Sequence, residues 1–218
     1  MNESPATTID LRHLADALTG AFPSLDAADQ QIAIATYRSL ARGLPASAEE
    51  IAVAAGVLPA EVEDRMEAWP GVFRDGDGRV IGFWGLTIHE MPPHELQVGE
   101  VKLWAWCAWD TLFLPARLGA VLQVLSVCPV TKETIELRVA PDHVESVLPD
   151  GVVVSFLSPE GRFDGNVITS FCHFIHFFAS QRAGDQWIKR HPGTFLLSLP
   201  DAVELARLSN LSLALAIA

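Results

Sequence analysis

Two adjacent prolines, Pro92 and Pro93, lie near the middle of the 218-residue chain. Consecutive prolines end regular secondary structure, so residues 91–94 are the expected boundary between two domains, 1–90 and 91–218. The two sides also differ in charge. Residues 1–100 contain 6 Arg and no Lys against 16 acidic residues, a net charge of −10, whereas residues 101–218 contain 9 basic and 11 acidic residues, a net charge of −2. The first domain is therefore strongly acidic and the second nearly neutral.

The first domain has the pattern of a winged helix. After nine residues that we expect to be disordered, helices are predicted for residues 10–22, 27–42, from 47 onward, and 60–69. Ser47 and Glu50 fit a capping box, in which each side chain accepts a hydrogen bond from the backbone of the other residue. Residues 72–74 and 79–83 flank an Asp-Gly-Asp-Gly turn and predict a hairpin wing. This turn is no calcium loop, because its fifth and twelfth positions hold Arg79 and Leu86.

Acidic residues on the second helix of the helix-turn-helix pattern argue against DNA binding. Residues 60–69 carry Glu61, Glu63, Asp64 and Glu67 against the single Arg65. DNA affinity depends on Lys and Arg side chains that neutralise phosphates, and this surface would repel them. We therefore expect a structural or substrate-gating role for the first domain, and no nucleic-acid partner.

The second domain is predicted to be α+β. Residues 120–126 and 133–139 form a predicted hairpin and residues 152–157 a buried strand, while residues 185–191 and 200–215 are predicted helices. The fold class expected for the whole chain is α+β: an N-terminal helical, winged-helix-like domain, followed by a small antiparallel sheet with flanking helices.

The cysteine count and the apolar segments bear on the cellular compartment. Three cysteines are too few for a disulfide scaffold. No charged segment followed by an apolar one opens the chain, so we expect no signal peptide, and no uncharged apolar run approaches the length of a membrane span. The expectation is a cytoplasmic protein with reduced thiols and no membrane partner.

A cysteine and an aspartate lie three residues apart in the tryptophan-rich stretch 104–113. Interpreted as a helix, this stretch places Cys107 and Asp110 on one face, about one turn apart. Cys107 would then lie in the opening turns, where the helix dipole favours a thiolate. The plain alternative is a buried cysteine that packs as a small apolar residue. Asp110 favours a functional interpretation, because carboxylates are rarely buried without a partner or a role.

A second stretch, residues 170–180, holds Cys172 and two histidines. Cys172 follows Cys107 by 65 positions, so only the fold could bring the two thiols together. Two converging thiolates select soft ions, of which mercury is an extreme case. The paired cysteine pattern of a structural zinc site is absent, although a Cys/His zinc site that uses His173 and His176 is conceivable. The plain interpretation of His176 is a hydrogen-bonded core histidine.

Together the two stretches resemble the organomercurial (alkylmercury) lyase family. That family carries an A-W-C-A-x-D-T-L segment and an S-F-C-x-x-x-H-F-F-A-S segment, which match Ala105–Leu112 and Ser170–Ser180 here. Weaker matches are the Gly-Leu-Thr that begins at Gly85 and the hairpin cysteine Cys128. The resemblance is specific in the second half of the chain and only one of general pattern over the first 75 residues. His173 departs from the small residue or cysteine that the family often has there.

The resemblance implies cleavage of R–Hg⁺ to the hydrocarbon R–H and Hg²⁺. Cys107 and Cys172 would capture mercury, and Asp110 would protonate the leaving carbon and serve as a third ligand of the Hg²⁺ product. Trp106 and His173 are expected in the substrate pocket, and a structural role is carried over for the hairpin cysteine. No organic cofactor is implied. Low-molecular-weight thiols, or a mercuric reductase, would remove the Hg²⁺.

Two other classes of function remain open at this point. One is a soft-metal (mercury or copper) binding or chaperone protein that uses the same thiols without proton transfer. Asp110 discriminates here, because a carrier needs no acid beside its thiols. The other is a winged-helix metal sensor, which the acidic surface of the first domain argues against.

Overall fold

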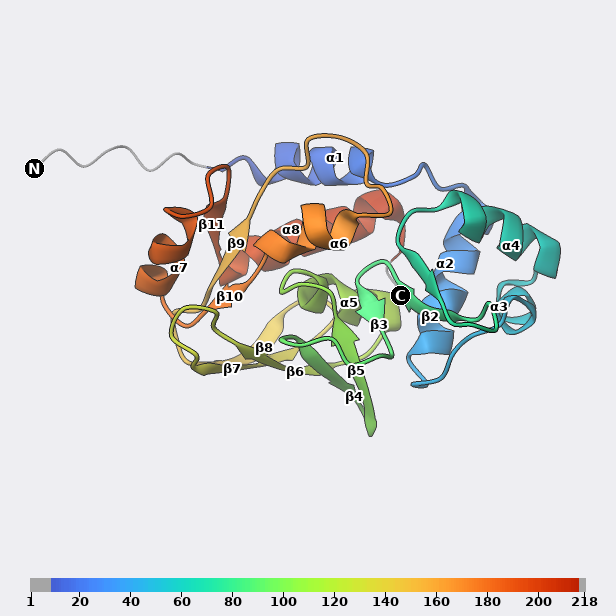
Figure 1. Cartoon of the computed structure of the whole chain (residues 1–218), viewed down its shortest axis with the longest axis horizontal. Helices are drawn as coiled ribbons and strands as arrows, with labels where there is room; N and C mark the ends of the chain where they lie inside the picture. The colour runs from blue at the N-terminus through green and yellow to red at the C-terminus, as the bar shows by residue number, and fades with distance from the viewer. Residues whose placement is uncertain (1–8, 216–218) are drawn as a thin grey trace, which may run out of the picture.

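The computed structural model describes residues 9–215, so the disorder expected for the first nine residues falls, except for Ile9, outside the described part. An antiparallel sheet lies beneath a layer of helices, and α2, α3 and α4 form one end of the molecule (Figure 1). The α+β class expected from the sequence is confirmed. Within residues 9–215, no helix is long and apolar enough to cross a lipid bilayer.

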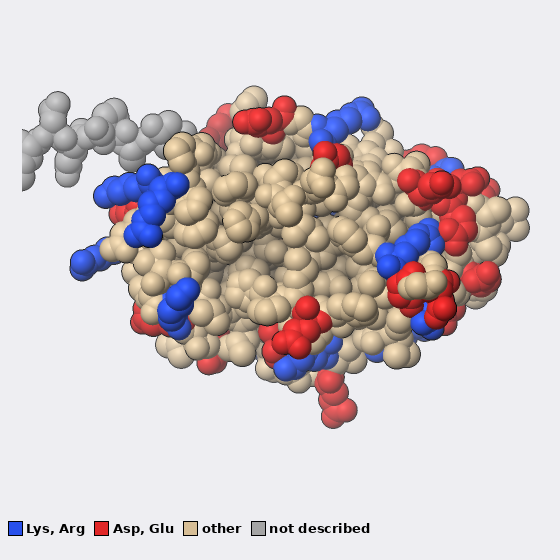
Figure 2. Space-filling model, in the orientation of Figure 1, with Lys and Arg blue, Asp and Glu red and all other residues tan. Residues whose placement is uncertain are grey.

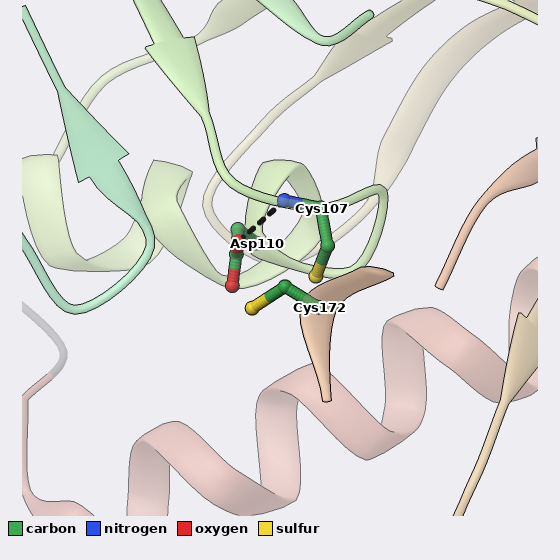
Figure 3. Close-up of side chains that lie close together, drawn as sticks. All are labelled: Cys107, Asp110 and Cys172. Carbon is green, nitrogen blue, oxygen red and sulfur yellow. Dashed lines mark hydrogen bonds between the residues drawn. The ribbon is translucent and has the colours of Figure 1, made fainter. Parts of the chain in front are cut away.

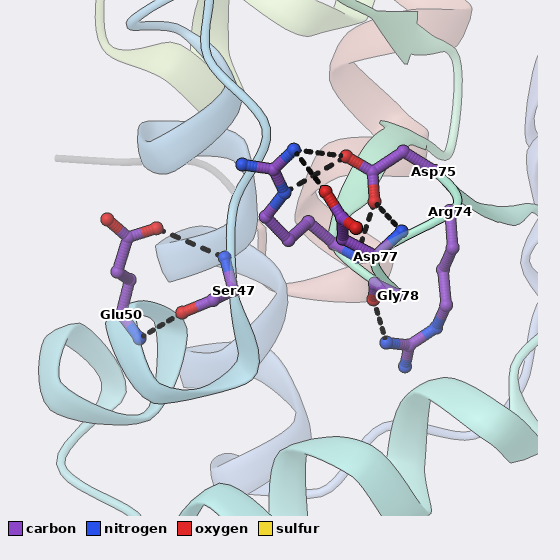
Figure 4. Close-up of polar contacts among 7 residues, drawn as sticks. Ser47, Glu50, Arg74, Asp75, Asp77 and Gly78 are labelled. Atoms are coloured by element: carbon purple, nitrogen blue, oxygen red, sulfur yellow. Dashed lines mark hydrogen bonds and ion pairs between the residues drawn. The ribbon is translucent and has the colours of Figure 1, made fainter.

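The first half folds into four helices and a hairpin, as the sequence predicted. These elements are α1 (Leu11–Ala21), α2 (Ala27–Leu40), α3 (Ala48–Ala55), α4 (Pro59–Ala68), β1 (Val72–Arg74) and β2 (Val80–Phe83). The predicted capping box starts α3: the backbone N–H of Glu50 donates to Ser47 Oγ at 3.2 Å, and that of Ser47 donates to Glu50 Oε2 at 3.1 Å (Figure 4). Local side-chain chemistry therefore sets where this helix begins.

Side chains of the hairpin itself hold the turn between β1 and β2. Asp75 Oδ1 accepts hydrogen bonds from the backbone N–H groups of Asp77 at 3.0 Å and Arg79 at 2.9 Å (Figure 4). The guanidinium of Arg79 pairs with both carboxylates, and Arg74 donates to the carbonyl oxygen of Gly78 at 2.7 Å. These acids thus stabilise a tight turn, as the sequence analysis expected.

The sheet is larger than the sequence predicted and runs through the expected domain boundary. Its strand order is β1-β2-β3-β5-β4-β6-β7-β8, with every neighbouring pair antiparallel. After β1 and β2 come β3 (Leu86–Thr87), β4 (Glu95–Val98), β5 (Val101–Ala105), β6 (Leu122–Val127), β7 (Thr134–Val139) and β8 (Val144–Leu148). Of these, β6 and β7 are the predicted hairpin, and the other four strands were not predicted. Because β2 of the hairpin pairs with β3, the wing and the second half share one set of backbone hydrogen bonds.

The second half also forms a smaller sheet of order β10-β9-β11, against which α7 and α8 pack. The elements are α5 (Asp110–Leu118), β9 (Val153–Phe156), α6 (Val167–Ser170), the 3-10 turn η1 (Cys172–Phe174), β10 (Phe177–Phe178), α7 (Gln181–Ile188), β11 (Phe195–Ser198) and α8 (Leu199–Leu213). Leu205, Ala206 and Leu213 of α8 are buried, and α8 packs against α1 and α5. The first and last helices of the described chain therefore share one core.

The stretch that contains Cys107 differs from the helix predicted for residues 104–113. Trp104 and Ala105 belong to β5, and α5 begins only at Asp110, so Cys107 lies in the connecting turn. Residues 104 and 105 form a strand and not a helix because Trp104 pairs with Glu95 of β4 and with Thr87 of β3, partners that no local pattern reveals. A proline often ends a helix, but Pro115 lies inside α5, which continues to Leu118 and stops at Gly119 with φ +61°.

Charged side chains are unevenly distributed over the surface. On the face shown in Figure 2 they gather at the two ends and are sparse over the centre, and acidic groups prevail at the end formed by α3, α4 and the β1–β2 turn. On α4, Glu61, Glu63, Asp64 and Glu67 are exposed. Arg65 is bound to Asp29 at 2.5 Å, so its charge is already neutralised within the protein. This distribution strengthens the electrostatic argument against a DNA-reading helix.

Candidate active site

Cys107, Asp110 and Cys172 lie together in the interior of the protein (Figure 3). Their ligand atoms all lie within 4.8 Å of one another, and the three residues are buried. Cys107 lies in the β5–α5 turn, Asp110 is the first residue of α5, and Cys172 is the first residue of η1. A backbone hydrogen bond of 3.2 Å from the N–H of Ala108 to the carbonyl oxygen of Ile175 holds the two segments together. The fold thus joins the two thiols that the sequence separates by 65 positions.

The turn before α5 orients the carboxyl group of Asp110. The backbone N–H of Cys107 donates a hydrogen bond of 2.7 Å to Asp110 Oδ2. On its other side the carboxyl group packs against Gly85, where a Cβ atom would lie 2.7 Å from both Cγ and Oδ1 of Asp110. Gly85 also has a φ of +96°, a backbone conformation that favours glycine. The carboxyl is therefore clamped between its own turn and the β2–β3 connection.

Burial controls the protonation of this group of residues. It raises the pKa of Asp110 to about 7, although hydrogen bonds from Cys107 and the charge of Arg117 act in the opposite direction. The pKa of Cys107 rises well above its usual value because the thiol is buried, is hydrogen-bonded to the thiol of Cys172 and lies close to the Asp110 carboxylate. A hydrogen bond with Cys107 lowers the pKa of Cys172, but burial and the charge of Asp110 outweigh it, so this pKa also rises. Both thiols keep their protons near neutral pH.

This protonation differs from the thiolate that the sequence analysis expected for the resting site. That expectation depended on a helix dipole, but Cys107 lies three residues before the first residue of α5 and is fully buried. A low dielectric and a neighbouring carboxylate both disfavour a negative sulfur. Any metal that these thiols bind must therefore displace their protons.

A buried arginine that the sequence analysis missed lies on the same helix. Arg117 is 0% exposed; its Nε donates to Asn210 Oδ1 at 2.9 Å and its Nη1 donates to the hydroxyl of Tyr37 at 2.6 Å. That hydroxyl donates in turn to the carbonyl oxygen of Trp84 at 2.8 Å, next to Gly85. The only signal in the sequence was one cation on an otherwise apolar helix, two turns after Asp110. Its partners lie 80 and 93 positions away.

An apolar cavity of about 30 Å³ adjoins Asp110 and Cys172. Aromatic rings make up most of its wall: Phe22, Trp84, Trp106, Trp109, Phe113, Phe163 and Phe171. Trp106, a predicted pocket residue, is part of this wall. His173 does not line the cavity and is exposed, because consecutive residues of the tight η1 turn point in different directions and Cys172 takes the inward one.

The remaining candidate ligands lie apart from this site. Among residues 9–215, Cys107, Asp110 and Cys172 are the one group with metal-ligand geometry. His176 is hydrogen-bonded through Nε2 to the carbonyl oxygen of His173 at 2.8 Å, as in the plain interpretation, but it is only partly buried and so is not a core residue. Cys128 is buried in the β6–β7 hairpin, where its sulfur accepts a hydrogen bond from the N–H of Thr131 at 3.5 Å.

Comparisons with known proteins agree with this arrangement. A family model described as "Alkylmercury lyase" matches residues 87–209, and one described as "Helix-turn-helix domain of alkylmercury lyase" matches residues 10–84. The chain is 41% identical to an alkylmercury lyase of Bacillus cereus over 169 residues, which cover 78% of this chain and 76% of that protein. It is 38% identical to one of Pseudomonas putida over 175 residues, 80% of this chain and 81% of that protein.

A solved structure shares the fold. The crystal structure of the mercury-bound form of MerB2 superposes with a TM-score of 0.71 and 23% identity, over 93% of this chain and 98% of that one. The resemblance inferred from the two cysteine segments is confirmed. Because one family model matches more than half of the chain and a second covers its first domain, the chain belongs to the alkylmercury lyase family.

Proposed function

We propose that this protein is an organomercurial lyase that converts R–Hg⁺ to the hydrocarbon R–H and Hg²⁺. The observation that carries the proposal is the buried group of Cys107, Asp110 and Cys172, with ligand atoms within 4.8 Å of one another. Two thiols suit a soft ion, and a carboxyl group with a pKa of about 7 suits proton transfer near neutral pH. Relatives named alkylmercury lyase support the same activity.

The resting protonation of the site supports a capture step by thiol exchange. An organomercurial arrives bound to a small thiolate, R–Hg–SR′. The thiol of Cys107 or Cys172 replaces that thiolate on mercury, and the departing thiolate takes the proton that the cysteine releases. One Hg–S bond breaks and one forms, so the charge buried in the site does not change. This neutrality matters, because an added charge in a buried site would be strongly unfavourable.

Asp110 then serves as a relay for the second proton. Its carboxylate accepts the proton of the remaining thiol while that sulfur joins mercury, and the two sulfur ligands weaken the carbon–mercury bond. The protonated Asp110 delivers the same proton to the leaving carbon as this bond breaks, so that R–H departs with the bonding electron pair. Hg²⁺ remains bound to the sulfur atoms of Cys107 and Cys172, and an oxygen of the regenerated Asp110 carboxylate is the third ligand.

The proposal extends to what the reaction needs besides the protein. The two thiols and the carboxyl group supply every group in the scheme, so no organic cofactor takes part. Low-molecular-weight thiols bring the substrate and remove Hg²⁺ from the site, and a mercuric reductase is a candidate acceptor of the product. The scheme requires reduced cysteines, as the cytosol provides.

A soft-metal carrier without lyase activity is the alternative. A carrier has to release its ion, and two exposed thiols would serve that purpose. Here the thiols are 0% and 5% exposed and share their space with a buried carboxyl group. Burial of a carboxyl group costs free energy, and a carrier, which transfers no proton, would gain nothing from it. The site therefore favours protonolysis over transport.

The test is hydrocarbon release from methylmercury and phenylmercury in the presence of excess small thiol, with methane and benzene quantified. Wild type should release both, and Cys107→Ser and Asp110→Asn should release neither at more than about one hundredth of that rate. Cys128→Ser, which alters the cysteine outside the site, is the matched control and should remain active. Retention of Hg²⁺ by wild type without any hydrocarbon would identify a carrier and refute the lyase proposal.

A further inference from the structure

Only a few of the residues that line the cavity beside Asp110 reach the surface. Most of the residues that line it are buried, including Trp106 and Trp109 at 7% and 2% exposure. The three lining residues that are partly exposed are Phe22, Pro70 and Phe163. A substrate that approaches Cys172 from solvent must therefore pass between these side chains, which we call the mouth.

The mouth joins segments that are far apart in the chain. Phe22 directly follows α1, and Phe163 lies in the connection between β9 and α6. Their rings pack edge-to-face with centroids 5.2 Å apart, and the backbone N–H of Phe163 donates to the carbonyl oxygen of Ala21 at 2.8 Å. Phe163 also packs against Phe171, next to Cys172, with centroids 5.0 Å apart. The two rings thus bridge the first and second halves at the cavity that Cys172 lines.

The space behind the mouth is small. Its volume of about 30 Å³ holds a methyl group, whereas an engineered protein cavity that binds benzene measures roughly 150 Å³. The inner wall cannot yield easily, because Trp109 and Phe113 are almost fully buried and pack edge-to-face with centroids 4.9 Å apart. Room for a larger organic group has to come from the partly exposed side, where Phe163 is flanked by the exposed residues Arg162 and Asp164.

We propose that Phe22 and Phe163 set the size limit for the organic group of the substrate, so that methylmercury enters freely and phenylmercury only when the two rings part. This inference rests on the proposed lyase function and extends it to substrate choice. Neither ring is placed among the reacting atoms, so these are specificity residues. Their effect should appear in the relative rates for large and small substrates and leave the proton transfer unchanged.

Truncation of the mouth should favour the larger substrate. In Phe163→Ala the ratio of kcat/KM for phenylmercury to that for methylmercury should rise about tenfold, the usual scale for a change of apolar pocket volume. Phe22→Ala should act in the same direction, and Phe163→Trp in the opposite one. Phe195→Ala removes a similarly half-exposed ring outside the cavity and should leave the ratio unchanged. Using the ratio cancels any general loss of activity.

A second readout tests the mouth without the lyase reaction. Methyl and benzyl methanethiosulfonate transfer CH₃S or C₆H₅CH₂S to a cysteine sulfur and release methanesulfinate, and mass spectrometry gives the rate at Cys107 and Cys172. Benzyl transfer should be slow in wild type and accelerate about tenfold relative to methyl transfer in Phe163→Ala. If Phe163→Ala shows this change in the benzyl-to-methyl ratio but the wild type releases no hydrocarbon, the lyase proposal is refuted and the size limit at the mouth still holds. An unchanged benzyl-to-methyl ratio in Phe163→Ala and Phe22→Ala would overturn the inference about the mouth.

Discussion

Asp110 has a pKa of about 7, whereas the neighbouring thiols have pKa values above their usual range. The sequence identified all three groups as candidates, since their types and their local segments were visible. The thiolate that it favoured for Cys107 was wrong, because the protonation of a thiol depends on the depth of burial and on contacts between segments. Arg117 was missed for the same reason: it acts through Tyr37 and Asn210, which only the folded chain brings near.

The relay fixes the expected pH dependence of the reaction. In the free enzyme Asp110 must be ionised to accept the second thiol's proton, so kcat/KM should rise as pH increases through about 7 and then reach a plateau. Arg117→Met should move this rise to higher pH, because the positive charge of Arg117 lowers the pKa of Asp110. The measurement is kcat/KM between pH 5.5 and 9 at a fixed concentration of small thiol. A rate that falls above pH 7 would mean that Asp110 starts protonated and acts only as a donor.

The contact between Gly85 and Asp110 predicts a second effect at this scale. In Gly85→Ala the new Cβ would lie 2.7 Å from the carboxyl group, so Asp110 must move and hydrocarbon release should fall at least about a hundredfold. Gly78→Ala is the matched control, because its φ is also positive, +79°, but its Cβ would meet nothing within 4 Å. Both variants should lose about 1 kcal/mol of stability from backbone strain. Equal activity in the two variants would show that the contact does not position Asp110.

At the scale of elements, the sequence predicted those parts whose causes are local. The capping box of Ser47 and Glu50 and the turn that follows β1 depend on residues within four positions of one another, and both form. The strands β3, β4 and β5 were missed because each is short. They pair with an adjacent strand of the chain through tight turns, but also with more distant strands, β3 with β5 and β4 with β6, that only the fold brings near. The same pairing of β5 converted the start of a predicted helix into a strand and a turn.

The capping box allows a direct measurement of such a local contribution. Ser47→Ala removes the acceptor for the N–H of Glu50, and the free energy of unfolding should fall by about 1 kcal/mol. Urea unfolding followed by circular dichroism measures this change. Ser47→Asp keeps an acceptor at the same position and should restore most of the stability. Hydrocarbon release at a temperature well below unfolding should be unaffected, because α3 does not line the cavity.

At the scale of the whole molecule, the fully buried His94 and the partly buried His176 limit the pH range of the fold. Burial lowers the pKa of His94 to about 3 and that of His176 to about 4. His94 is 1% exposed and is bonded through Nδ1 to Ser126 Oγ at 2.9 Å, between the sheet and the segment that carries Cys172. In the unfolded chain a histidine takes up a proton near pH 6.5, so stability is lost as pH falls below this value.

For His94 alone the expected loss between pH 7 and pH 5 is about 2 kcal/mol. Urea unfolding at the two pH values measures it. His94→Gln should lose stability at pH 7 but show a smaller difference between pH 7 and pH 5, because the titrating group is gone. His89→Gln, which alters an exposed histidine, should retain the wild-type difference. A wild-type protein that is equally stable at both pH values would contradict this prediction.

The high proton affinity of Cys107 and Cys172 also bears on how the protein survives between encounters with its substrate. Peroxides and alkylating agents attack thiolates, and reactive cysteines in other proteins are damaged for that reason. A protonated pair of thiols behind two aromatic rings should react slowly with such agents. Mercury still reacts with the pair, because this metal binds sulfur strongly enough to displace the proton. The site should therefore resist oxidation and alkylation between turnovers and remain reactive toward mercury.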